Sequence, residues 1–229
     1  MKLTYRLQCI ADKIKKGSFP ADIGTDHAYV PIYLVKKGLC SRAIASDVRI
    51  GPLKRAERNI KLYNLQDKIE LRKGSGLESI GEGEVDCAIL AGMGGYLICD
   101  ILENDKTKAD TIDYFIIQPM QAPEVVREYL YKNNYKICEE QLVRDSGKIY
   151  EVMIAMHGID KVDESIYYEL GKNLIINKDP LLYEFINNKI KELKKIIYDI
   201  SDNDSYNAQQ RIKECIVKID KYEEVLECL

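Results

Sequence analysis

One short segment constrains the fold of this chain more than any other. Residues Pro20–Ala28 run from a short apolar stretch through an acid and a glycine to an amphipathic segment that begins at Tyr29. This order is typical of a strand, a tight turn and a helix. Glycine lets such a turn approach a ligand closely, and the helix N-terminus offers unpaired N–H groups. The segment therefore predicts a nucleotide-type ligand site at the end of a strand in an α/β sheet.

The polar residues of this turn indicate which ligand it suits. The spacing is not the phosphate fingerprint G-x-G-x-x-G, because Thr25 occupies the second turn position and Asp26 and His27 follow it. Two carboxylates here would repel a pyrophosphate, whereas they would attract a sulfonium and an ammonium group. We therefore interpret the segment as a site for S-adenosylmethionine rather than NAD, which disfavours a dehydrogenase.

Strand-like and helix-like segments alternate through the first two-thirds of the chain. The expected strands are Phe19–Ile23, Arg42–Ser46, Lys68–Arg72, Val85–Leu90, Asp113–Ile117, Tyr135–Val143 and Ile149–His157. The expected helices are 3–16, 30–38, 51–64, 94–104 and 123–133. This alternation predicts a mostly parallel sheet with helices on both faces. The last two strands have no helix between them, so we expect an antiparallel hairpin around Asp145–Gly147, as in the seven-stranded Rossmann-like class I methyltransferases.

The pattern changes near residue 163. Apolar residues recur at spacings of three and four over 182–200 and again over 212–229, on either side of the polar stretch Ser201–Ser205. Two amphipathic helices around a polar turn predict a coiled-coil hairpin. We expect a methyltransferase domain over 1–160 and a helical domain over 161–229. The hairpin is either a structural appendage or an arm that holds an extended substrate.

Composition narrows the class of protein further. No apolar run approaches the ~20 residues that span a bilayer, and the first residues lack the apolar core of a signal peptide. The seven cysteines form no C-x-x-C pair and the chain has two histidines, which predicts reduced thiols and no metal site. We expect a cytoplasmic protein with no membrane partner, and a monomer, with a homodimer through the hairpin as the alternative.

Three further loops are expected at the carboxyl edge of the sheet, where open α/β sheets bind ligands. Asp47 follows the second strand and can accept hydrogen bonds from ribose hydroxyls. Lys73–Leu77 contains two glycines, and Leu77 would cover an adenine face. Ala91–Gly95 has three glycines, which indicates a ligand against the backbone. It lacks the D/N-P-P-Y/F/W run of enzymes that methylate exocyclic amines, so a ring nitrogen is the better candidate acceptor.

The sequence resembles the bacterial tRNA adenine-22 N1-methyltransferases. The stretches that carry the resemblance are Leu3–Leu7, Asp22–Pro31, Ala91–Gly95 and Gln118–Met120, and it extends over essentially the whole chain, including the helical hairpin. The resemblance implies S-adenosylmethionine as methyl donor and N1 of an adenine in the D-loop region of tRNA as acceptor. One departure is Ser75, which stands where many related methyltransferases place an acid.

Candidate site residues follow from these loops. The cofactor-binding candidates are Asp22, Gly24, Thr25, Asp26, His27, Asp47, Val48, Gly74, Ser75, Gly76, Ala91, Gly92 and Met93. The catalytic candidates are Asp26, His27 and Met93. Asp26 would stabilise the base as it becomes cationic, or would bind the methionine ammonium. His27 would donate to the base edge or relay a proton, or would act as a strut at the helix start. Met93 would pack against an extruded base.

The remaining candidates concern the substrate. Arg6, Arg49, Arg55, Arg58, Gly94, Gly95 and Gln118 are the substrate-binding candidates. Five cations over residues 49–61, diluted only by Glu57, favour phosphate contacts over a merely solvated face. Two rival functions remain open at this point. One is a small-molecule methyltransferase, and the other is a non-catalytic RNA-binding adaptor that keeps the fold.

Overall fold

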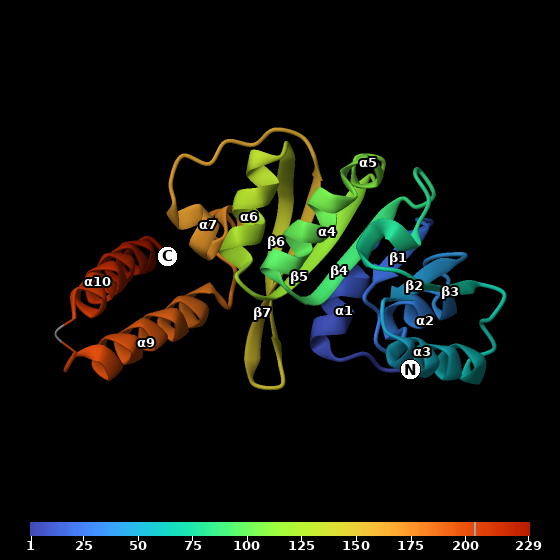
Figure 1. The fold of residues 1–229 in the computed structure, drawn as a ribbon, viewed down its shortest axis with the longest axis horizontal. Coiled ribbons are helices and arrows are strands. Elements are labelled where there is room, and N and C mark those ends of the chain that lie inside the picture. Colours follow the sequence, from blue (N-terminus) through green and yellow to red (C-terminus); the bar gives the residue numbers. More distant parts are fainter. Residues whose placement is uncertain (204) are drawn as a thin grey trace. The chain divides into compact units, whose positions relative to one another are not determined.

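The computed structural model describes residues 1–203 and 205–229 (Figure 1). The chain divides into two compact units, Met1–Lys161 and Val162–Leu229. The first unit is built on a seven-stranded sheet. Its strands are β1 (Pro20–Ile23), β2 (Ala43–Asp47), β3 (Ile69–Lys73), β4 (Cys87–Gly94), β5 (Tyr114–Gln121), β6 (Tyr135–Asp145) and β7 (Lys148–His157).

The strand order is β3-β2-β1-β4-β5-β7-β6. All neighbours pair in parallel except β7, which is antiparallel to both β5 and β6. The turn between β6 and β7 places Ser146 and Gly147 at φ 51° and 79°. Two successive positive φ angles suit the two-residue turns of tight hairpins. The expected mostly parallel sheet with a terminal hairpin is confirmed, and its antiparallel strand lies inside the sheet rather than at its edge.

Helices cover both faces of this sheet (Figure 1). They are α1 (Tyr5–Asp12), α2 (Tyr29–Lys36), α3 (Ile50–Leu62), α4 (Gly95–Asn104), α5 (Lys106–Ala109) and α6 (Pro123–Lys132), with the short 3-10 helix η1 (Gly76–Ser79). Successive side chains of a strand point to opposite faces. On β4, Cys87 and Ile89 therefore join a core with α1 and α2, whereas Ala88 and Leu90 join a core with α4 and α6.

Several expected boundaries differ from the structure. The helix expected over 3–16 ends at Asp12, because the Lys13 N–H bonds to the Ile10 carbonyl at 3.2 Å and the chain then reverses near Gly17, at φ 92°. The stretch Ala91–Gly94, expected as a loop, continues β4 and pairs with β5 through two register shifts. A positive φ of 77° at Gly92 accommodates this bulged pairing.

The second unit is helical throughout its regular structure. It contains α7 (Ile166–Leu170), α8 (Lys172–Ile176), α9 (Leu182–Ile200) and α10 (Tyr206–Glu227). Helices α9 and α10 lie side by side as the expected hairpin, while α7 and α8 were not expected from the sequence (Figure 1). Asp204, in the expected polar turn, lies outside the described residues. None of the helices in the described part of the chain combines the length and apolar character needed to cross a bilayer.

Candidate active site

A cavity of about 400 Å³ opens at the carboxyl ends of β1 and β4. Helix α1 and the turn between β1 and α2 complete its walls. The lining residues are Arg6, Leu7, Ile10, Asp22, Gly24, Thr25, Asp26, His27, Ala28, Tyr29, Val30, Arg49, Ile89, Ala91 and Gly92. Ligands of open α/β sheets bind at this edge, so the cavity is the candidate active site.

Backbone and side-chain hydrogen bonds fix the turn between β1 and α2. The Thr25 N–H donates to the Ser46 carbonyl of β2 at 2.7 Å. The Thr25 hydroxyl accepts from the Ala28 N–H at 3.1 Å, and the Asn59 amide of α3 donates to the His27 carbonyl at 2.9 Å. The turn is therefore anchored to the two neighbouring elements, which keeps its polar side chains at the cavity.

Two carboxyl groups end neighbouring strands at this edge. Burial, together with the negative charge of Asp47, raises the pKa of Asp22 to about 6, against a hydrogen bond with Thr25 that lowers it. The Asp47 side chain is buried, and its Oδ1 accepts from the Arg49 N–H at 2.7 Å. Burial and like charge disfavour the ionised form of Asp22, and a bound cation would relieve both penalties.

The half-exposed Asp26 carboxylate joins two cavity residues and α3. Its Oδ1 accepts from Nε of Arg55 at 3.0 Å and also from the Arg55 Nη2. Its Oδ2 lies 3.2 Å from Nε2 of His27, whose ring stacks on Tyr29. The structure thus brings the catalytic candidates Asp26 and His27 together with the substrate candidate Arg55.

Arg6 reaches the cavity from α1. Its Nη1 donates to Oε1 of Gln118 at 2.6 Å, and its guanidinium lies 5.5 Å from the centre of the Tyr150 ring. Gln118 is fully buried and also donates to the Pro119 carbonyl at 2.8 Å. The substrate candidates Arg6 and Gln118 are therefore linked, with Gln118 orienting the arginine.

Glycine is required at Gly24 and at Gly95 for different physical reasons. Gly24 adopts φ 76°, and a Cβ built there would lie 2.3 Å from Cε of Met93, so the Met93 side chain packs directly over the turn. A Cβ at Gly95 would lie 2.2 Å from the Ala122 carbonyl oxygen, which indicates close backbone packing between α4 and the start of α6. Gly94 has open space around it. Gly24 is thus needed at the cavity, and Gly95 is needed for packing.

The loop after β3 departs from its expected role. Leu77 is fully buried in the core shared with α4 and α6, so the prediction that it covers an adenine face is wrong. A Cβ at Gly74 would lie 2.9 Å from Ser79, and Ser75 caps η1 with Glu78. Gly76 packs against Ile101. These contacts explain the two glycines and Ser75 of this loop by packing and helix capping.

Several cavity residues are not among the candidates that the sequence predicts. They are Leu7, Ile10, Ala28, Tyr29, Val30 and Ile89. Most of these are small or apolar and belong to helical or strand patterns that predict core. Tyr29 differs, because an aromatic residue directly after a ligand-binding turn was a signal that could have been used. Of the remaining candidates, Val48 and Arg58 are exposed on the segment after β2.

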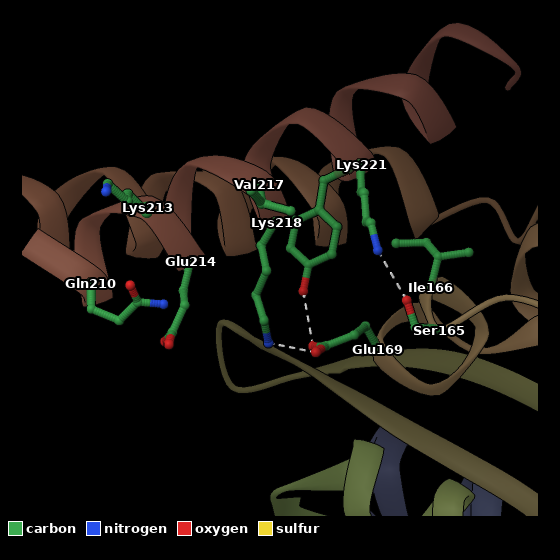
Figure 2. A pocket seen from close by; sticks show the side chains of 10 residues that line it. Ser165, Ile166, Glu169, Gln210, Lys213, Glu214, Val217, Lys218 and Lys221 are labelled. Carbon is green, nitrogen blue, oxygen red and sulfur yellow. Dashed lines mark hydrogen bonds and ion pairs between the residues drawn. The ribbon is translucent and has the colours of Figure 1, made fainter.

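A second cavity, of about 340 Å³, lies within the helical unit between the segment of α7 and helix α10. Figure 2 shows that some of its polar groups bond to one another. Lys218 pairs with Glu169, the Tyr222 hydroxyl donates to Glu169 at 3.1 Å, and Lys221 donates to the Ser165 hydroxyl at 3.0 Å. These bonds join the α7 segment to α10, as expected where two helices pack together. Among the described residues, no cluster of His, Cys, Asp or Glu is arranged to hold a metal ion.

The strand order, the single antiparallel strand, the acid-glycine turn after β1 and the buried acid after β2 together define a Rossmann-like methyltransferase. The family model described as tRNA (adenine(22)-N(1))-methyltransferase matches residues 20–224. The chain belongs to this family.

Several relatives match along almost their whole length. The tRNA (adenine(22)-N(1))-methyltransferase of Bacillus subtilis is 35% identical over 99% of this chain and 98% of its own. The crystal structure of the B. subtilis m1A22 tRNA methyltransferase TrmK superposes with a TM-score of 0.89 and covers 98% of this chain and 99% of that one. M. capricolum TrmK in complex with S-adenosyl-homocysteine is 30% identical, with a TM-score of 0.85 over 99% of this chain and all of that one.

Proposed function

We propose that this protein transfers a methyl group from S-adenosylmethionine to N1 of adenine 22 in tRNA. The observation that carries the proposal is the cavity at the Gly24 turn, which Asp22 and Asp26 line. Full-length similarity to the B. subtilis methyltransferase supports it, as does a Streptococcus pneumoniae relative, 28% identical with a TM-score of 0.89, whose structure holds S-adenosyl-L-methionine.

The residues present fit this cofactor. Asp22 and Asp47 supply the negative charge that a sulfonium and an ammonium require, and a cationic ligand would relieve the desolvation that raises the pKa of Asp22. Gly24 forms the tight turn at φ 76° beneath Met93, and Asp47 ends β2 at the position where these folds bind a ribose. When bound, S-adenosylmethionine supplies an electrophilic methyl group on a positively charged sulfur.

Adenine N1 carries a lone pair at neutral pH, so the reaction needs no base to create a nucleophile. As N1 bonds to the methyl carbon, the carbon–sulfur bond breaks, its electron pair stays on sulfur, and the base becomes cationic. Asp26 lines the cavity, and its carboxylate would stabilise this developing charge. His27, held beside Asp26, would orient the base edge. The contribution of the protein is alignment and charge.

Cations beside the cavity would hold the RNA backbone. Arg49 lines the cavity and is largely exposed, and Arg55 and Arg58 follow on α3. The apolar side chains of Val48 and Ile50 are exposed on the same segment. Because N1 is paired or stacked in folded RNA, the nucleotide must be extruded into the cavity, and exposed apolar groups at the rim suit unstacked bases.

The experiment that tests this function is mass spectrometry of nucleosides from tRNA incubated with the protein and a donor labelled in the methyl group. We expect labelled 1-methyladenosine from tRNA with adenine at position 22 and none from the same tRNA with guanine there. Label in free adenosine but not in tRNA would instead support a small-molecule methyltransferase. A well-folded protein that gives no calorimetric heat with the donor or its demethylated product would support the adaptor.

The proposal includes a monomer that acts in the cytoplasm. Sedimentation velocity of the purified protein, alone and with tRNA, tests the oligomeric part. A dimer that dissociates on substitution of apolar residues in α9 would contradict it. Fractionation of the source cells tests the location.

A further inference from the structure

Tyr29 borders the candidate active site and has no role in the function described above. We propose that its ring is the surface on which the target adenine stacks during methyl transfer, an inference that rests on the proposed function. Tyr29 is the first residue of α2 and lines the cavity with Asp26 and His27. It is 40% exposed, in contrast to the buried α2 residues Val30 and Ile32. A large ring thus borders the cavity without being absorbed into the core.

The ring belongs to an ordered stack. The Tyr29 and His27 rings lie 4.9 Å apart between centroids, with 7° between their planes. A third flat ring can extend such a stack, and stacking of a base on an aromatic side chain contributes about 1–3 kcal/mol whatever the base. The stack therefore suits an unstacked base that has left its RNA helix.

The local backbone holds this stack in place. Ala28, which separates His27 and Tyr29 in the sequence, is fully buried and adopts a left-handed conformation at φ 54°. This conformation costs a non-glycine residue about 1 kcal/mol or more, and such strain persists where surrounding contacts over-determine it. Here those contacts include the Asn59 bond to the His27 carbonyl. The rings are thus presented to the cavity in advance of any ligand.

Although Arg6 and Arg49 also line the cavity and Arg55 binds Asp26, two groups at the stack itself favour a cationic base over a neutral one. Asp26 Oδ2 lies beside the His27 imidazole at 3.2 Å, so a carboxylate borders the stack. The face of a tyrosine ring also attracts positive charge. Methylation at N1 makes the adenine ring cationic, so these two interactions are stronger in the transition state than with the neutral substrate. Tyr29 is therefore expected to affect turnover as well as RNA binding.

The cofactor also carries an adenine, which is the main alternative occupant of the stack. Asp47, the candidate for the cofactor ribose, is not among the described residues that line this cavity, whereas Tyr29 is. This separation favours the RNA base as the partner of Tyr29.

Tryptophan fluorescence tests the stack directly, because the chain contains no tryptophan. In the full-length Tyr29→Trp variant with S-adenosyl-homocysteine bound, we expect tRNA carrying adenine 22 to quench emission by about half or more. The same tRNA with an abasic site at position 22 should leave most of the emission. Tyr63→Trp is the matched control, because Tyr63 packs under Lys36 at the far end of α3 and should not respond.

Two fluorescence results would overturn the proposal. Equal quenching by S-adenosyl-homocysteine alone would place the cofactor adenine on the ring. Unchanged emission on saturation with tRNA would show that no base reaches the ring.

Kinetics provide a second, independent test. Tyr29→Leu keeps an apolar side chain but loses the ring, so kcat should fall about tenfold or more, with the calorimetric Kd for S-adenosylmethionine unchanged. Tyr29→Phe should restore most of the lost rate. A Leu variant with wild-type kcat, or with an equal loss of cofactor affinity, would overturn the proposal. If the wild-type protein itself fails to methylate tRNA, the proposed function is wrong and the stacking role falls with it. If the wild-type protein methylates tRNA but the Tyr29 variants give the contrary fluorescence or kinetic results above, only the stacking role is wrong.

Discussion

Asp22 illustrates at the scale of one residue how a binding site costs stability. Its folded pKa of about 6 lies above the ordinary value of 3.8. Between about pH 4 and 6 the folded protein holds a proton that the unfolded chain has lost, so stability falls as pH rises through this range. We expect Asp22→Asn to raise the free energy of unfolding by about 1–2 kcal/mol at pH 8, after a discount for solvent contact. The gain should vanish near pH 4 and be accompanied by weaker cofactor binding.

Urea unfolding at pH 4, 6 and 8 measures this effect. Asp67→Asn, on an exposed turn, is the matched control and should show no pH-dependent gain. A stabilisation that is larger at pH 4 than at pH 8 would show that burial does not raise the pKa of Asp22.

Asp26 is the residue whose charge the reaction is expected to use. Replacing it by asparagine keeps the shape and removes the carboxylate that faces Arg55 and His27. We expect kcat at saturating cofactor to fall about 100-fold, in line with losses seen when one charge-stabilising group is removed from an active site. Single-turnover methylation of tRNA measures this, again with Asp67→Asn as control. An unchanged rate would rule out a charge-stabilising role for Asp26.

At the scale of one element, α3 supplies the cations expected to meet the tRNA backbone. Arg55 is bound to Asp26, so reversing its charge would also disturb the catalytic candidate, whereas Arg58 is exposed on the next turn. We expect Arg58→Glu to weaken tRNA binding and to reduce the slope of log affinity against log salt by about one, with cofactor affinity unchanged. The control is Lys68→Glu, because Lys68 precedes β3 and lies at the amino ends of the parallel strands, away from the cavity. Equal loss of tRNA and cofactor affinity would indicate misfolding.

A buried ionic cluster joins helix α6 to the β6–β7 hairpin. The guanidinium of Arg127, which is fully buried, donates to Glu140 of β6 at 2.7 Å and to Glu151 of β7 at 2.5 Å. The two glutamates raise its pKa against the opposing effect of burial. We expect Arg127→Met to lower the free energy of unfolding by about 3–5 kcal/mol, because two buried carboxylates lose their partner.

Chemical denaturation measures the role of this cluster. Exchanging Glu140 and Glu151 for glutamine in the Arg127→Met background should recover part of the loss. A loss below ~1 kcal/mol in the single variant would mean that water reaches the cluster.

At the scale of the whole molecule, the two compact units divide the work. Every described residue that lines the candidate active site belongs to Met1–Lys161. We therefore expect a protein of residues 1–161 to bind S-adenosylmethionine with the affinity of the full chain, as measured by calorimetry. A large loss of cofactor affinity would contradict this division. The tRNA affinity of the 1–161 protein decides whether the α9–α10 helical hairpin is a substrate arm or a structural appendage.

Local patterns in the sequence were sufficient to predict the sheet, the helical hairpin and the turn at Asp22–Ala28. Alternation of strands and helices is a local property, because each element must present an apolar face of its own period to the core. The acid-glycine turn is likewise local, since its backbone geometry depends on adjacent residues. The cofactor class followed from the charge of that turn alone.

Only the tertiary structure decided which side chains share the cavity. Tyr29, Ile10 and Leu7 come from helices whose patterns predict packing, and their meeting depends on how α1 and α2 lie on the sheet. Leu77 was assigned to the site because it follows a glycine loop, but η1 turns it into the core. Contacts between distant segments depend on packing that no local pattern encodes. The sequence by itself therefore determined the architecture and the class of ligand, and the packing of helices against the sheet decided which residues meet that ligand.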